Sequence, residues 1–218
     1  MRVYHLVGHK HGLENLRLRR LKIAEIDKLN DPFELRSFSS KDQEIRDALE
    51  TTRSELAKKT GILCFSKNWN NPVLWSHYAE QHRGMALGFD VEDCYIKEVT
   101  YLGTRKFFDS RILSEDLTLA EEQILGWLTT KYSHWKYENE WCLFARLEEP
   151  DASSKLYFAP FSDKLRLREV ILGVRSTVSK SEIFNALGDL STDVVSQKAR
   201  LAFGSYRVVK QRNLTLWE

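Results

Sequence analysis

The sequence predicts an α+β fold, in which helices pack on a mixed, largely antiparallel sheet or sheets. Short segments with the composition of strands are mixed with helical patterns, and the two kinds do not alternate regularly. Of the 218 residues, 42% are hydrophobic and 29% charged, which is the balance of a folded, water-soluble protein. No repeat or linker of low complexity divides the chain, so we expect a single globular domain over residues 1–218.

The first half of the chain predicts two strands and three helices. Residues 2–7 (RVYHLV) have the composition of a strand, and residues 61–66 (GILCFS) are apolar throughout, as in a buried strand. Helices are predicted over residues 12–23, 42–59 and 71–84. The last helix has the clearest end signals, with Asn71 as N-cap, Pro72 at the first position and Gly84 at the end.

The second half predicts a similar mixture of elements. Strands are expected over residues 84–90 (GMALGFD), 96–102 (IKEVTYL), 136–147 (KYENEWCLFARL), 167–174 (LREVILGV) and 204–211 (GSYRVVKQ). Helices are expected over residues 114–132 and 179–190.

Net charge and targeting signals narrow the function classes. Lys and Arg total 33 against 31 acidic residues, and the net charge of +2 is too small to imply a polyanionic partner. Nucleic-acid binding would need a local basic patch. No apolar run is long enough for a secretory signal or a membrane span, so we expect a cytoplasmic protein with no membrane partner.

The cysteine and histidine patterns predict no metal site. The three cysteines are far apart and form no CxxC motif, so each is most simply a small core residue. His5, His9 and His11 lack a further ligand at a known metal-binding spacing.

The stretch SHWKYENEW, residues 133–141, contains two acids among aromatics. If it is a strand, Glu138 and Glu140 point to one face about 7 Å apart, and Trp135 and Trp141 point to the other. In a cleft such a pair provides one substrate-binding acid and one catalytic acid. On a solvated strand face the same two residues would be ordinary polar positions.

Two other motifs each have a functional and a structural interpretation. In the helix over residues 71–84, Trp75 and Tyr78 share a face that could stack a base or a nicotinamide ring, although such a stripe also suits a core. In the turn NDPFE, Asn30 and Asp31 could position a ligand or only cap the turn while Phe33 fills the core.

Several segments together resemble a bacterial family of unknown function. The segments are LNDPFE, ILCFS, PVLWSHYAEQHRGMALGFD and WKYENEW. The joint occurrence of NDPFE, CFS, WSHYA and YENEW is specific, whereas each motif alone is weak. This resemblance implies no biochemical activity.

A looser resemblance, to ADP-ribosyltransferases, does imply chemistry. The chain has an opening strand with Tyr-His, a central strand ending in Ser and a late E-x-E pair. The resemblance implies that NAD is a substrate, that Glu140 is catalytic and that Glu138 assists with an acceptor of unknown identity. It implies no metal. We place the NAD contacts at His5, Asn30, Asp31, Ser66, Trp75, His77 and Tyr78.

The leading hypothesis is therefore an NAD-using enzyme of the ADP-ribosyltransferase type, a defence or toxin-type effector. One alternative is a nucleic-acid-binding or RNA-processing protein that uses the basic segment RLRRLK, residues 17–22, although that segment also suits the solvated side of a helix. Another alternative is a non-catalytic interaction or sensor domain, in which the motifs only close a core.

Overall fold

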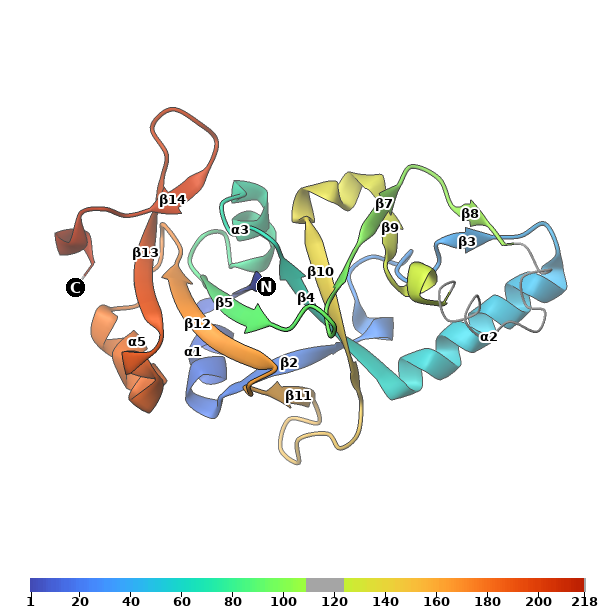
Figure 1. Ribbon diagram of the computed structural model, residues 1–218, viewed down its shortest axis with the longest axis horizontal. Helices are drawn as coiled ribbons and strands as arrows, with labels where there is room; N and C mark the ends of the chain where they lie inside the picture. The colour runs from blue at the N-terminus through green and yellow to red at the C-terminus, as the bar shows by residue number, and fades with distance from the viewer. Residues whose placement is uncertain (109–123, 218) are drawn as a thin grey trace.

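The α+β fold with a largely antiparallel open sheet is confirmed by a computed structural model, which describes residues 1–108 and 124–217 (Figure 1). The main sheet has the order β11-β2-β4-β1-β5-β12-β13-β14, and β10 and β6 attach beside β4. Its strands are β1 (Arg2–Val7), β2 (Arg20–Glu25), β4 (Thr60–Ser66), β5 (Met85–Val91), β6 (Lys97–Glu98), β10 (Glu140–Arg146), β11 (Tyr157–Pro160), β12 (Leu165–Leu172), β13 (Val195–Leu201) and β14 (Val208–Lys210). The β12–β13 pair is parallel and the other pairs of this sheet are antiparallel.

Two short parallel pairs lie beside the main sheet. They are β3 (Phe38–Ser39) with β8 (Lys106–Phe107), and β7 (Thr100–Leu102) with β9 (Thr130–Tyr132). The helices are α1 (His9–Leu18), α2 (Gln43–Lys59), α3 (Pro72–Tyr78) and α5 (Lys180–Leu187), with 3-10 turns η1 (Ile26–Lys28), η3 (Ser133–Glu138), η4 (Gly188–Thr192) and η5 (Leu214–Leu216). In the ranges described, no helix is both long and apolar enough to cross a membrane.

Helices cover both faces of the sheet around β1, β5 and β12. On one face α1 and α5 bury Leu16 and Ile183 in the largest apolar cluster, which also contains Val170. On the other face α3 packs Trp75 against Ile171. Because this centre is closed on both sides, open space in the molecule lies toward β4 and β10.

Three predicted helices end earlier than expected. The first stops at Leu18, because Arg19 adopts a left-handed conformation (φ 54°) and the alternating burial of the next residues belongs to β2. The helix capped by Asn71 ends at Tyr78 rather than Gly84. In the predicted helix over residues 114–132, residues 114–123 lie outside the described part; residues 124–128 are helical and Thr130 already begins β9.

The remaining differences concern strands. The predicted strand over residues 96–102 is two short strands, β6 and β7, and only residues 208–210 of the predicted last strand pair, as β14. The sequence analysis missed β2, β11 and β13, and also the short strands β3, β8 and β9. The largest difference is at residues 133–138, which form η3 rather than the start of a strand.

Candidate functional site

Strand β4 is paired differently along its two edges, and a cavity lies where the pairing is incomplete. One edge pairs with β10 along its whole length, from Arg146 opposite Thr60 to Glu140 opposite Ser66. The other edge meets β2 at Gly61 and Ile62, and β1 only at Ser66. Because β1 and β2 diverge between these contacts, the sheet leaves room for a cavity of about 210 Å³ that opens to solvent.

Most of the predicted site residues line this cavity. They come from β1, the turn after η1, the end of β4, the end of α3, the end of η3 and the start of β10. In that order they are His5, Asn30, Ser66, Tyr78, Glu138 and Glu140. Segments that are distant in sequence therefore meet at one point, which is the geometry that a catalytic site requires.

His5 is held as a neutral imidazole. Its Nδ1 lies 3.0 Å from the carbonyl oxygen of Cys64, which is on the β4 edge that β1 leaves unpaired. A carbonyl can only accept, so Nδ1 donates and Nε2 remains an acceptor. Burial lowers the pKa of His5, which keeps the ring uncharged at neutral pH. A neutral Nε2 suits a hydroxyl donor such as that of a ribose.

Three buried glutamates surround one lysine beside the cavity. The Lys131 ammonium lies 3.4 Å from an Oε2 of Glu34 and 3.4 Å from an Oε2 of Glu138. Its contact with Glu140 is closer still. All four side chains are at most 9% exposed. One positive charge thus faces three acids in a region that water barely reaches.

The excess of acids over cations changes the protonation of the cluster. Burial raises the pKa of Glu34 to about 7, and burial also raises the pKa of Glu138, although Lys131 opposes both effects. Burial would lower the pKa of Lys131, but Glu140 and Glu34 outweigh it and raise that pKa. Lys131 therefore stays charged at neutral pH, and Glu138 keeps its proton to a higher pH than an ordinary glutamate does.

Two tyrosines fix the orientation of the acids. The Tyr78 hydroxyl donates to Glu138 and accepts from the Asn30 amide at 3.4 Å. The Tyr101 hydroxyl accepts the backbone N–H of Glu140 at 2.8 Å. Burial raises the pKa of Tyr78 and of Tyr101, so both remain phenols that can hold these positions.

The two glutamates reach the cavity by a different route from the predicted one. Glu138 ends η3, Asn139 is left-handed (φ 44°), and Glu140 starts β10. The prediction that both lie on one strand face is wrong, and Trp135 and Trp141 do not share the opposite face. The turn at Asn139 changes the chain direction between the two acids, and both side chains still line the same cavity.

Three predicted NAD contacts lie away from the cavity lining. Asp31 caps the NDPFE turn, where its Oδ1 accepts the Phe33 N–H at 2.8 Å. Trp75 is fully buried and its ring stacks on His82. His77 is exposed and its ring centroid lies 6.1 Å from that of Tyr137. Asp31 thus caps the turn and Trp75 belongs to the core, as the structural alternatives expected. The expectation that Phe33 fills the core is wrong, because its side chain is 55% exposed.

The sequence analysis missed Lys131 and Glu34. Lys131 lies in the segment predicted as helix, and Glu34 lies in the NDPFE turn, where attention fell on Asn30 and Asp31. The available signal was charge: a lysine seven positions before the first glutamate of YENEW, and a further acid in the NDPFE motif.

Ligand atoms of Cys64, Cys142 and Glu140 lie within 4.8 Å of one another. Cys64 and Cys142 are opposite one another across the β4–β10 pair. Burial contributes to raising the pKa of both thiols, and Lys131 already supplies Glu140 with a positive charge. We therefore treat the group as part of the wall of the site rather than as a cation site.

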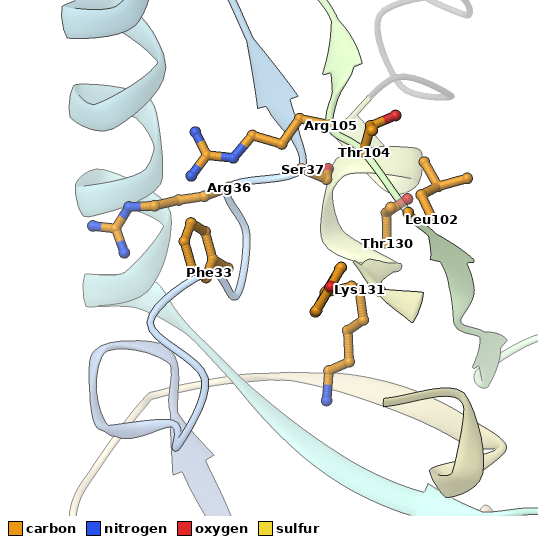
Figure 2. Close-up of a pocket in the computed structure, with 10 residues that line it drawn as sticks. Phe33, Arg36, Ser37, Leu102, Thr104, Arg105, Thr130 and Lys131 are labelled. Atoms are coloured by element: carbon orange, nitrogen blue, oxygen red, sulfur yellow. The ribbon is translucent and has the colours of Figure 1, made fainter. Parts of the chain in front are cut away.

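A second cavity of about 230 Å³ is also lined by Lys131 (Figure 2). Its lining includes the Phe33 ring, Arg36, Thr104 and Arg105. Lys131 lines both cavities, so it belongs to the acid cluster and to the wall of this more basic region.

The raised pKa of Glu34 predicts a pH-dependent stability. Its folded-state pKa of about 7 exceeds the ordinary value of 4.5, a difference that corresponds to about 3 kcal/mol in the free energy of unfolding. This contribution to stability is fully present below about pH 4.5, where the carboxyl is protonated in both states, and is lost as the pH rises to about 7. Glu34→Gln should remove that part of the slope in denaturant unfolding measured from pH 4.5 to 7.5. An unchanged slope would contradict the assignment.

A family model matches the middle of the chain. Residues 74–143 match the family described as protein of unknown function (DUF2971). This segment contains the WSHYA and YENEW motifs, together with Tyr78, Lys131, Glu138 and Glu140. We found no match to a curated protein or to a solved structure.

Proposed function

We propose that the protein is an NAD-using enzyme of the ADP-ribosyltransferase type, in which Glu140 is catalytic. The observation that carries the proposal is the convergence of His5, Tyr78, Glu138 and Glu140 on one cavity. The match to a family of unknown function is compatible with this activity and gives it no independent support. We further propose that the enzyme acts in bacterial defence or as a toxin-type effector in the cytoplasm.

The size of the cavity suits one end of the dinucleotide. Binding sites for whole small-molecule ligands commonly have volumes of about 300–1,000 Å³. At about 210 Å³, this cavity is below that range, so it suits the nicotinamide and its ribose while the rest of NAD lies outside. The neutral His5 offers an acceptor to a ribose hydroxyl, and Tyr78 lines the same cavity.

The proposed reaction breaks the bond between C1′ of the ribose and N1 of nicotinamide. The bonding electron pair leaves with nicotinamide, and positive charge develops on the ribose as an oxocarbenium ion. Glu140 stabilises that charge, because a carboxylate already in place at a buried site needs no reorganisation during the reaction. Lys131 holds Glu140 in place through their ion pair.

Glu138 suits the second half of the reaction. A lone pair of the acceptor, or of water, forms the new bond to C1′, and the acceptor releases a proton. Glu138 takes that proton and later passes it to solvent. Burial raises the pKa of Glu138 above the ordinary value of a glutamate, and a higher pKa makes its carboxylate a stronger base.

Binding of NAD tests the proposal before turnover is considered. Titration of the protein with NAD should give saturable binding and raise the melting temperature. Nicotinamide riboside should compete, because it occupies the same cavity, whereas AMP should compete poorly. Binding of AMP with no effect of the riboside would place the ligand elsewhere and would contradict the assignment of the cavity.

Tyr78→Phe tests Tyr78 as a positioning residue. The phenol donates to Glu138 and lowers the pKa of that carboxyl, so its loss should raise that pKa further. We expect a fall in kcat of about tenfold and a shift of the rising limb of the kcat profile to higher pH. Tyr95→Phe, at an exposed tyrosine, is the control. A lower kcat without any shift of the profile would assign Tyr78 a structural role only.

The basic segment of the nucleic-acid alternative does not form a free patch. Arg19 pairs with Asp189 at 2.5 Å, and Arg20 pairs with Asp151 at 2.8 Å while covering the Phe158 ring. Two of its four cations are therefore neutralised by acids from the C-terminal half of the chain.

A further inference from the structure

A polar groove adjoins the candidate site at Ser66. It has a volume of about 390 Å³ and shares Ser66 with the cavity that holds the acids. We call it the amide groove, since its lining includes four asparagines. They are Asn68, Asn70, Asn71 and Asn139.

The far wall of the amide groove is the β13–β14 hairpin. Tyr206 and Arg207, from the turn of the hairpin, line the groove. The hairpin projects from one end of the sheet (Figure 1). The N–H of Val208 donates to the carbonyl of Asn70 at 2.9 Å, which holds the hairpin beside the groove. Val208 is also fully buried in the apolar cluster of Trp75.

The hairpin and the strand ends around it are strongly basic. Residues 195–217 contain five Lys or Arg residues and no Asp or Glu. The five are Lys198, Arg200, Arg207, Lys210 and Arg212. Among the described residues, none of them forms an ion pair with a carboxylate. The chain therefore has a local excess of positive charge at this end of the sheet, although its net charge is only +2.

Two aromatic rings at the hairpin turn are almost completely exposed. Phe203 is 97% exposed and Tyr206 is 98% exposed. The Arg200 guanidinium lies over the Phe203 ring, 4.8 Å from its centroid. Exposed rings interleaved with cations are the combination that binds single-stranded nucleic acids, because bases stack on the rings and phosphates pair with the cations.

The groove between the hairpin and the acids has groups that suit base edges. The side-chain amides of Asn68, Asn70 and Asn139 form no hydrogen bond to the described part of the chain. An amide offers one acceptor and two donors, so it can pair with the polar edge of a base. A lipid surface would use the rings and cations but would leave these amides without partners.

We infer that the acceptor of this enzyme is a single-stranded nucleic acid, which binds along the β13–β14 hairpin and places one base in the amide groove next to Ser66. The transfer step assumes the proposed function. The binding of the nucleic acid does not depend on that function and rests on the hairpin alone. In the transfer, a nitrogen or oxygen of the base supplies the lone pair that bonds to C1′ of the ribose. Nicotinamide leaves with the old bonding pair, and Glu138 takes the proton that the base releases.

Fluorescence anisotropy with a labelled single-stranded 16-mer tests the binding. DNA and RNA versions of the 16-mer show which of the two nucleic acids the protein binds. We expect the affinity to fall steeply as the salt concentration rises. Arg207→Ala/Lys210→Ala should reduce the slope of log K against log salt by about 1.4, because two phosphate contacts are lost from a single strand. Tyr206→Ala should weaken binding about tenfold.

A matched variant separates a local effect from bulk charge. Lys10→Ala/Arg17→Ala removes the same charge from two exposed positions on α1. Arg17 is the first residue of the basic segment RLRRLK. This control variant should leave the slope unchanged. An equal effect of both double variants, or binding to phosphatidylserine vesicles but not to the 16-mers, would overturn the inference.

Nicotinamide release is followed separately, so that the two claims fail in distinguishable ways. Oligonucleotide binding without release would contradict the proposed function and leave the binding surface standing. Release without oligonucleotide binding would overturn the acceptor assignment alone. Incubation of the protein with the 16-mer and NAD should increase the mass of the strand by that of one ADP-ribose. A strand of unchanged mass after complete NAD cleavage would contradict the transfer.

Discussion

Glu140→Gln is expected to lower the rate of nicotinamide release by about 10²–10³-fold while the protein stays folded. The carboxylate is the group that faces the developing positive charge, and removal of one such electrostatic contact commonly has an effect of this size. The melting temperature should change little. Three acids compete for the single ammonium of Lys131, so removing one relieves repulsion at the same time as it removes an ion pair.

The control for this variant is Glu148→Gln, at an exposed position two residues after the end of β10. It removes the same charge without touching the cavity, and its rate should equal that of the wild type. Steady-state kinetics and thermal unfolding should be measured on the same preparations. Equal rates for Glu140→Gln and the wild type would remove Glu140 from the mechanism, whatever the stability of the variant.

Lys131→Met is expected to have the largest effect on stability, about 3–5 kcal/mol at pH 7. Met preserves most of the volume but leaves Glu34, Glu138 and Glu140 buried without a positive charge, and breaking a buried charge pair costs about this much. The exposed pair of Lys58 and Glu55, 2.6 Å apart, provides the control. Lys58→Met should cost at most about 1 kcal/mol.

The loss in Lys131→Met should depend on pH in a defined direction. Without the ammonium, which lowers both values, the folded-state pKa values of Glu34 and Glu138 rise further above their unfolded values. Their protonated forms then favour the folded state, so stability is retained below about pH 4.5 and lost as the pH rises. Denaturant unfolding at pH 4.5 and pH 7.5 should therefore show a larger deficit at pH 7.5. An equal deficit at both values would assign Lys131 a packing role instead.

The convergence of the motifs could be predicted from the sequence better than the local geometry that produces it. The composition of β1 and β4 predicted the strands that contain His5 and Ser66, with Ser66 at a strand end. The pattern of α3 predicted the helix that contains Tyr78, although that helix was expected to continue to Gly84. The turn around Asn139 could not be predicted, since the aromatic composition of residues 133–141 favours a strand and the left-handed residue is an asparagine rather than a glycine.

Lys131 shows why part of the site could not be predicted. It lies in β9, which pairs with β7, and neither strand has a pattern that distinguishes it from its surroundings. Its importance comes from burial among three acids that belong to separate segments. Trp75 shows the opposite case: helical spacing placed it on the face of Tyr78, but α3 buries it against Ile171 on the sheet. Spacing fixes which residues share a face, and tertiary packing decides which of them reach a cavity.

The most direct test is the release of nicotinamide from NAD by the purified wild-type protein, followed by chromatography over time and compared with Glu140→Gln at equal melting temperature. The proposed function predicts release that is proportional to wild-type protein and reduced at least about a hundredfold in the variant. If the wild type binds NAD and releases no nicotinamide, either alone or with the single-stranded 16-mers, the proposed activity is contradicted and the cavity is a binding site only.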